Sequence, residues 1–123
     1  MDPADRSAIQ DLTTALGSGA DPRRASQMAA YMKGRFEFLG IPSPERRRLA
    51  QPFQVAMRDA DQGRLLVVAA SLWSLPYREF AYVAADLLRR HERRLAPSAL
   101  EPLRELITTD SWWDGVDPLS RVV

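Results

Sequence analysis

The sequence of 123 residues predicts a single all-α domain, and three observations support this fold class. Prolines follow polar residues at Asp2-Pro3, Asp21-Pro22 and Ser43-Pro44, which is the pattern with which helices begin. Apolar residues recur three and four positions apart after each start, as on the buried face of a helix. The chain is therefore divided by helix signals rather than by strand signals.

The first half of the chain is expected to form three helices. The first begins at Asp2-Pro3 and ends at Gly17 and Gly19, since glycine readily adopts the backbone conformations that stop a helix. The second begins at Asp21-Pro22, and the third runs from Ser43-Pro44 to residues 59–61. Their predicted inner faces are Ile9, Leu12 and Leu16 in the first, Ala25, Met28, Ala29 and Met32 in the second, and Leu49, Phe53, Val55 or Ala56, and Met57 in the third.

The second half is expected to form three more helices. A fourth ends at Trp73, a fifth and longest begins at Pro76, and a sixth begins at Pro97. The fifth ends in a charged stretch, residues 89–94. The predicted inner faces are Leu65, Leu66, Val68, Ala69 and Leu72 in the fourth, Phe80, Val83, Ala84, Leu87 and Leu88 in the fifth, and Leu100, Leu103, Leu106 and Ile107 in the sixth.

Six helices with short connections suit antiparallel pairs that stack into an α-solenoid of the HEAT or armadillo type. A compact helical bundle would show the same pattern, so the helical pattern alone leaves both architectures open. We expect six antiparallel helices in a right-handed stack, without a sheet.

Composition limits the possible chemistry. The chain has no cysteine and one histidine, His91, which excludes disulfides, thiol chemistry and the usual zinc sites, so we expect no metal and no cofactor. The N-terminus lacks the pattern of a signal peptide, and no apolar run approaches the roughly 18 residues that span a bilayer. We therefore expect a cytoplasmic protein without a membrane partner. The net charge of +1 says little about partners, because charge can still gather on one face.

Three segments carry a resemblance to a known family. They are residues 28–47 (MAAYMKGRFEFLGIPSPERR), residues 72–80 (LWSLPYREF) and residues 111–117 (SWWDGVD). In this order they resemble the AlkD-like DNA alkylation repair enzymes, which are HEAT-like DNA glycosylases. The resemblance implies a concave helical solenoid over residues 1–123, similar to the N-terminal portion of the family fold.

The resemblance also implies a function, the hydrolysis of the N-glycosidic bond of cationic N3- and N7-alkylated purines in duplex DNA. An alkylated purine of this kind already carries a positive charge, so it leaves as a neutral base and needs no general acid. A site without histidine or cysteine is then adequate. The reaction needs a carboxylate that stabilises the positive charge developing on the deoxyribose.

The segment 111–117 supplies the candidate catalytic residues. Asp117 matches the family's catalytic carboxylate, Trp113 would present an aromatic face to the cationic lesion, and Trp112 would contact DNA. The structural alternative is that both tryptophans pack in a core and that the aspartates cap helices. Asp114 fits a capping box with Ser111. Pro118 follows Asp117 directly and favours a capping role for it too.

Basic residues are the remaining candidates for DNA contact. Lys33, Arg35, Arg46 and Arg47 are expected to contact phosphates. Residues 46–48 are all arginine at the start of a helix, and successive residues point about 100° apart, so at most two can face one groove. The stripe formed by Arg89, Arg90, Arg93 and Arg94 at a helix C-terminus is explained more simply as solvated surface. Tyr31, Phe36, Glu37 and Phe38 are expected to pack the second helix against the third.

The chain ends at Val123, whereas the family fold continues for about as many residues again. The chain is therefore interpreted as a fragment, a natural truncation or an inactive relative. The apolar residues Val116, Leu119, Val122 and Val123 would lack partners and favour self-association. Three functions stay open on these grounds: a glycosylase, a non-catalytic HEAT-like DNA-binding module, and a scaffold that binds another protein.

Overall fold

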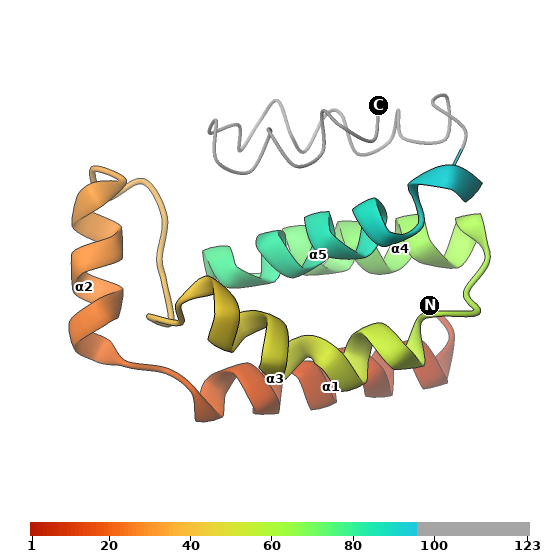
Figure 1. The fold of residues 1–123 in the computed structure, drawn as a ribbon, viewed down its shortest axis with the longest axis horizontal. Helices are drawn as coiled ribbons and strands as arrows, with labels where there is room; N and C mark the ends of the chain where they lie inside the picture. The colour runs from red at the N-terminus through yellow and green to blue at the C-terminus, as the bar shows by residue number, and fades with distance from the viewer. Residues whose placement is uncertain (96–123) are drawn as a thin grey trace.

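The structure, a computed structural model, describes residues 1–95, and its regular elements are all helical (Figure 1). The elements in order are α1 (Pro3–Ser18), α2 (Pro22–Tyr31), α3 (Ser43–Ala56), α4 (Gln62–Trp73), α5 (Arg78–Arg90) and the 3₁₀ helix η1 (Glu92–Arg94). Within residues 1–95 the only β-type pairing is one isolated bridge between Glu37 and Tyr77. The all-α prediction is confirmed, while the helix predicted from Pro97 lies outside the described residues.

Aspartate side chains cap three of the helices. Asp2 accepts a hydrogen bond from the Ala4 amide, and Asp21 and Asp61 do the same at the start of α2 and α4. These bonds satisfy amides in the first turn that have no partner inside the helix. The predicted starts of α1, α2 and α3 are correct to within a residue.

The prediction for the fifth helix was wrong in two respects. Helix α5 begins at Arg78 rather than at Pro76, and with 13 residues it is shorter than α1, which has 16. The Arg78 amide donates to the Glu37 carbonyl oxygen over 2.8 Å. Because Tyr77 forms the bridge with Glu37, it has extended backbone and precedes the helix instead of joining it.

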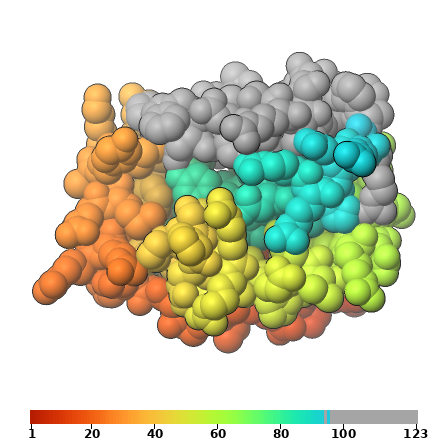
Figure 2. All heavy atoms as spheres, viewed as in Figure 1, coloured from red at the N-terminus to blue at the C-terminus, as the bar shows by residue number. Residues whose placement is uncertain are grey.

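The helices form two antiparallel pairs, α1 with α3 and α4 with α5, and α2 stands across one end (Figure 1). Helix α3 also packs on α5, and α1 on α4, so the two pairs stack into one body. On the face shown in Figure 2, the surface of α3 borders that of α5. Side chains from α3 and α5 therefore meet on one face of the molecule.

The core lies between the two pairs and contains most of the predicted inner residues. The prediction that Val55 or Ala56 lies on the inner face of the third helix was wrong, since Val55 is 48% exposed and Ala56 is exposed as well. Helix α3 instead turns a face with Ala50 and Phe53 inward. The packing role of Tyr31 is also wrong, because its side chain is 76% exposed, and α2 contains no buried residue.

The loop between α2 and α3 is fixed on α5 by the carboxylate of Glu79, which is fully buried. Its oxygens accept hydrogen bonds from the amides of Leu39, Gly40 and Ile41 at 2.9–3.2 Å. Gly40 has a φ of +93°, and a Cβ there would lie 2.1 Å from the carbonyl oxygen of Asp21. Only glycine fits this approach, which sets where α3 begins.

Candidate nucleic-acid interface

The N-terminal turn of α3 meets the C-terminal half of α5 through a partly buried ion pair. Arg46 Nη2 lies 3.2 Å from Asp86 Oδ2, and the two side chains are 8% and 18% exposed. The Arg46 guanidinium also lies over the Tyr82 ring, 5.1 Å from its centre, and donates to Ser43 Oγ over 3.4 Å. Asp86 Oδ1 is 4.0 Å from Arg89 Nη2. One carboxylate thus stands between two guanidinium groups.

A groove runs over this pair, and we call it the arginine groove. Its first part has a volume of about 350 Å³, and its second part a volume of about 250 Å³. The two parts share Arg47, Asp86 and Arg89, so they are continuous. The residues that line the groove are Met28, Ser43, Arg46, Arg47, Tyr82, Asp86, Arg89 and Arg90.

The arginine groove carries an excess of positive charge. Among the described residues, four arginines line it and Asp86 is its one carboxylate. Arg47 and Arg90 are exposed, and neither forms an ion pair with a carboxylate of residues 1–95. Exposed guanidinium groups that no nearby carboxylate neutralises favour anions, and bind phosphate oxygens with a matching fork of N–H donors.

The structure separates the predicted site residues. Arg46 and Arg47 lie in the arginine groove, with Arg46 buried and Arg47 exposed. Lys33 and Arg35 are exposed in the turn after α2 and do not line the groove, and Lys33 has a φ of +58°. The predicted catalytic and DNA-contacting residues Asp117, Trp113 and Trp112 lie outside the described residues, as does Asp114.

Sequence reasoning missed the contribution of α5 to this site. It interpreted Arg89 and Arg90 as solvated surface, and it did not consider Tyr82 or Asp86. A usable signal was the spacing from Asp86 to Arg89 and Arg90, three and four residues on, which places all three on one side of a helix. That they face Arg46, forty residues earlier, depends on the packing of α3 on α5.

A second arginine is buried beside this site. The Arg78 guanidinium lies over the rings of Phe36, Trp73 and Tyr82, at 4.0, 5.5 and 5.7 Å from their centres. Contacts of this kind stabilise a cation that has been removed from water. Tyr82 therefore joins Arg78 to Arg46 and ties the arginine groove to the loop before α3.

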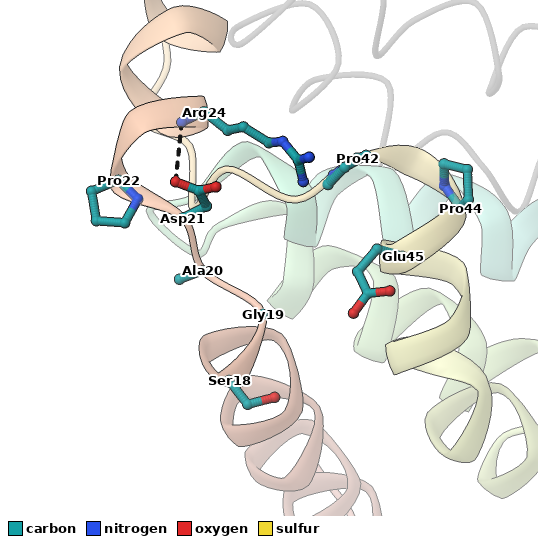
Figure 3. Close-up of a pocket in the computed structure, with 9 residues that line it drawn as sticks. All are labelled: Ser18, Gly19, Ala20, Asp21, Pro22, Arg24, Pro42, Pro44 and Glu45. Carbon is teal, nitrogen blue, oxygen red and sulfur yellow. Dashed lines mark hydrogen bonds between the residues drawn. The ribbon is translucent and has the colours of Figure 1, made fainter.

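A larger pocket lies elsewhere, between the turn from α1 to α2 and the start of α3 (Figure 3). It measures about 620 Å³. Its carboxylates already have partners, because Asp21 caps α2 and Glu45 accepts a hydrogen bond from Arg48 over 3.1 Å. The Arg48 bond holds the pKa of Glu45 below its usual value. We assign no chemistry to this cavity.

A further pocket of about 400 Å³ lies between α1 and α3, and its lining is mainly apolar. No group of three or more histidine, cysteine or acidic side chains is placed to hold a metal ion within residues 1–95. No helix in the described part of the chain is long and apolar enough to cross a membrane.

The stacked helical pairs and the cationic groove define an all-α protein with a surface suited to a polyanion. Residues 12–123 match the family of DNA alkylation repair enzymes. The chain belongs to this family, as its three sequence segments predict.

One solved structure gives the same result. The chain is similar to a predicted DNA alkylation repair enzyme from Enterococcus faecalis, with a TM-score of 0.77 and 29% sequence identity. The match covers 84% of this chain and 48% of that one, so the chain corresponds to about half the length of this relative. No curated protein matches the chain.

Proposed function

We propose that the protein is a DNA glycosylase, intact or truncated, that hydrolyses the N-glycosidic bond of cationic N3- and N7-alkylated purines in duplex DNA. The observation that carries the proposal is the family match over residues 12–123, which includes the segment SWWDGVD. The arginine groove supports a DNA partner. In this proposal the helical pairs are HEAT-like repeats whose shared face binds the duplex, and the protein acts in the cytoplasm.

The chemistry needs little from the protein besides charge and position. A cationic purine departs as a neutral base, so positive charge gathers on the sugar in the transition state, and a fixed carboxylate stabilises it. In the proposal Asp117 is this carboxylate. Trp113 stacks against the cationic nucleotide, a contact worth about 0.5–2 kcal/mol, and Trp112 contacts the DNA. Lys33, Arg35, Arg46 and Arg47 serve the phosphates.

The test is the release of 7-methylguanine from methylated duplex DNA in single-turnover reactions. Asp117→Asn keeps the size of the side chain and removes its charge, so it should slow release by about 30-fold to 1000-fold, or about 2–4 kcal/mol. Asp114→Asn is the matched control and should keep most of the rate. A full rate in Asp117→Asn together with a loss in Asp114→Asn would reject the assignment.

A second candidate is a DNA-binding module without catalysis. It is favoured by one observation, that the arginine groove lies wholly within residues 28–90 and so does not require Asp117. Salt-dependent binding to undamaged duplex, without release of any methylated base, would support this candidate. It would also exclude the glycosylase.

Self-association through the apolar residues Val116, Leu119, Val122 and Val123 remains a separate prediction. Sedimentation of the chain at tens of micromolar should show a dimer or larger species. A clean monomer would count against it.

A further inference from the structure

We propose that the arginine groove is a site for the phosphodiester backbone of DNA. In this site Arg46, Arg47, Arg89 and Arg90 contact the phosphates, and Asp86 positions Arg46 and Arg89. The inference rests on the proposed DNA partner and adds two contact residues of α5 that the sequence assigns to solvent. It also gives a role to Asp86, the acidic residue that lines this cationic groove.

The first argument is the charge left over in the arginine groove. Each oxygen of Asp86 has one arginine partner: Arg46 lies 3.2 Å from Oδ2 and Arg89 lies 4.0 Å from Oδ1. Arg47 and Arg90 have no such partner among residues 1–95. A polyanion bound along the groove would neutralise Arg47 and Arg90, and the counterions condensed on the polyanion would be released.

The second argument is the N-terminus of α3. Aspartates cap α1, α2 and α4, whereas α3, which begins at Ser43 after Pro42, has no side-chain cap, and neither has α5. The N-terminal turn of a helix carries partial positive charge, and Arg46 and Arg47 lie close to it. An anion held there offsets this unfavourable arrangement, which is how helix N-termini bind phosphate.

The third argument is independent of the helix end. The side chain of Arg46 is only 8% exposed, and its Nε makes no hydrogen bond within the described residues. Arg89 Nε is likewise buried without an acceptor. Buried charged donors without acceptors are costly. A small shift of either guanidinium toward a phosphate oxygen in the groove supplies the missing acceptor.

The lining indicates a backbone contact rather than base recognition. Among the described residues that line the arginine groove, the one aromatic ring is that of Tyr82, and it lies against the Arg46 guanidinium. Residues 1–95 therefore offer a base no further ring in the groove on which to stack. Contacts of guanidinium groups with phosphates fix the position of a protein on the duplex without reading its sequence.

The experiment uses the whole chain and an undamaged duplex, with fluorescence anisotropy at several salt concentrations. Arg47→Gln/Arg90→Gln removes two exposed charges without disturbing a described ion pair. Each lost phosphate contact lowers the slope of log K against log salt by about 0.9. The double variant should therefore show a slope smaller by about 1.8 and bind roughly 60-fold more weakly at about 0.1 M salt.

Arg58→Gln is the matched control. Arg58 follows the C-terminus of α3, and its ion pair with Asp59 lies on an exposed surface. It is eleven residues beyond Arg47, roughly 16 Å along a helix, which exceeds the screening length of about 10 Å at 0.1 M salt. This variant should keep the wild-type slope, and circular dichroism should show the same helical content in all three proteins.

Several outcomes would overturn the site. One is a double variant that keeps the wild-type slope, and this outcome leaves the glycosylase proposal intact. Another is displacement of DNA by poly-glutamate as effectively as by competitor duplex at equal charge concentration, which would identify an acidic-peptide surface. Wild type that binds no DNA would overturn both proposals. If the wild type binds DNA with a steeper slope of log K against log salt than the double variant but releases no base, the result supports the site and rejects only the glycosylase proposal.

Discussion

Helix α5 carries two carboxylates, Glu79 and Asp86, two turns apart on one side of the helix, and they bind different parts of the chain near the start of α3. Glu79 is fully buried and accepts from three consecutive backbone amides of the loop before α3. Asp86 is 18% exposed and faces two arginines in the arginine groove. The partners of Glu79 are fixed donors of the main chain, whereas those of Asp86 are the long side chains of the buried Arg46 and the partly exposed Arg89.

The difference shows how one helix divides structural and binding roles. Backbone amides cannot move away, so Glu79 fixes the path of the chain and loses its partners only when the loop unfolds. Arginine side chains can turn toward a ligand, so Asp86 can orient them without holding them permanently. We therefore expect changes near Glu79 to affect stability, and changes near Asp86 to affect binding.

Gly40→Ala should have the largest effect on stability, because it forces the Glu79 loop away from α2. A Cβ would lie 2.1 Å from the Asp21 carbonyl oxygen, at a φ of +93°. The backbone strain and the overlap together should cost about 4 kcal/mol. The measurement is urea unfolding followed by circular dichroism.

Gly34→Ala is the control for Gly40→Ala. Gly34 also has a positive φ, of +72°, but a Cβ there would have no atom within 4 Å. It should cost only about 1–2 kcal/mol, the strain alone. Equal losses in the two variants would mean that the contact with α2 contributes nothing.

Glu79→Gln should cost about 3 kcal/mol in the free energy of unfolding. The neutral amide is a weaker acceptor for the three amides, and its own NH₂ group faces donors, so buried N–H groups lose their partner. Chemical denaturation measures the loss. A loss of less than about 1 kcal/mol in the free energy of unfolding would contradict the structural role of Glu79, because its effect would then be no larger than that of Asp86.

Asp5 offers an intermediate case. Its buried carboxylate pairs with Arg64 at 2.7 and 3.1 Å, and this hydrogen bonding holds the pKa of Asp5 below its usual value. Asp5→Asn should cost about 1–2 kcal/mol at neutral pH, since Arg64 is 40% exposed and solvent screens the pair.

The pH dependence of this cost follows from the direction of the pKa shift. A lowered pKa stabilises the fold above the unfolded value of about 3.9, and this contribution is lost as the pH falls through the folded value. The difference in the free energy of unfolding between wild type and Asp5→Asn should therefore be constant from about pH 5 to 7, a range that begins about one unit above the unfolded pKa. It should shrink below about pH 4. A difference that grows on acidification would refute the assignment.

Asp86→Asn should have the smallest effect on stability, about 1 kcal/mol. The amide keeps an oxygen that can accept from the buried Arg46, and Arg89, whose side chain is 37% exposed, can turn to solvent. Its effect on DNA affinity separates charge from positioning. Removing a negative charge alone would tighten binding, whereas loss of the positioning of Arg46 and Arg89 should weaken it by about threefold, or about 0.7 kcal/mol. Asp59→Asn, at a side chain 92% exposed, is the control with the same charge change. Tighter binding by Asp86→Asn would contradict a positioning role.

Much of the fold is predictable from local sequence. The Asp-Pro pairs identify the starts of α1 and α2, and the apolar period identifies most of the core. The path of residues 32–42 is not predictable in this way, because Glu79 reads locally as an ordinary acidic residue in a first turn. Its partners lie about forty residues earlier.

The site is predictable only in part, for the same reason. Local geometry shows that Arg46 and Arg47 point in different directions, and in the structure one is buried and the other exposed. It cannot show that Arg46 pairs with Asp86, since that depends on how α3 packs on α5. The roles of Asp117, Trp113 and Trp112 rest on the family segment and remain predictions.

Helix α2 buries no residue, although it borders the arginine groove through Met28. Apart from its own hydrogen bonds, its connection to the rest of residues 1–95 is mainly at its base, where the Asp21 amide donates to the Leu39 carbonyl oxygen and Gly40 packs closely. A segment with so few buried contacts opens at a free energy well below that of global unfolding. Amide hydrogens of α2 should therefore exchange with deuterium long before those of α4 and α5, which makes α2 a separate cooperative unit at the edge of the fold.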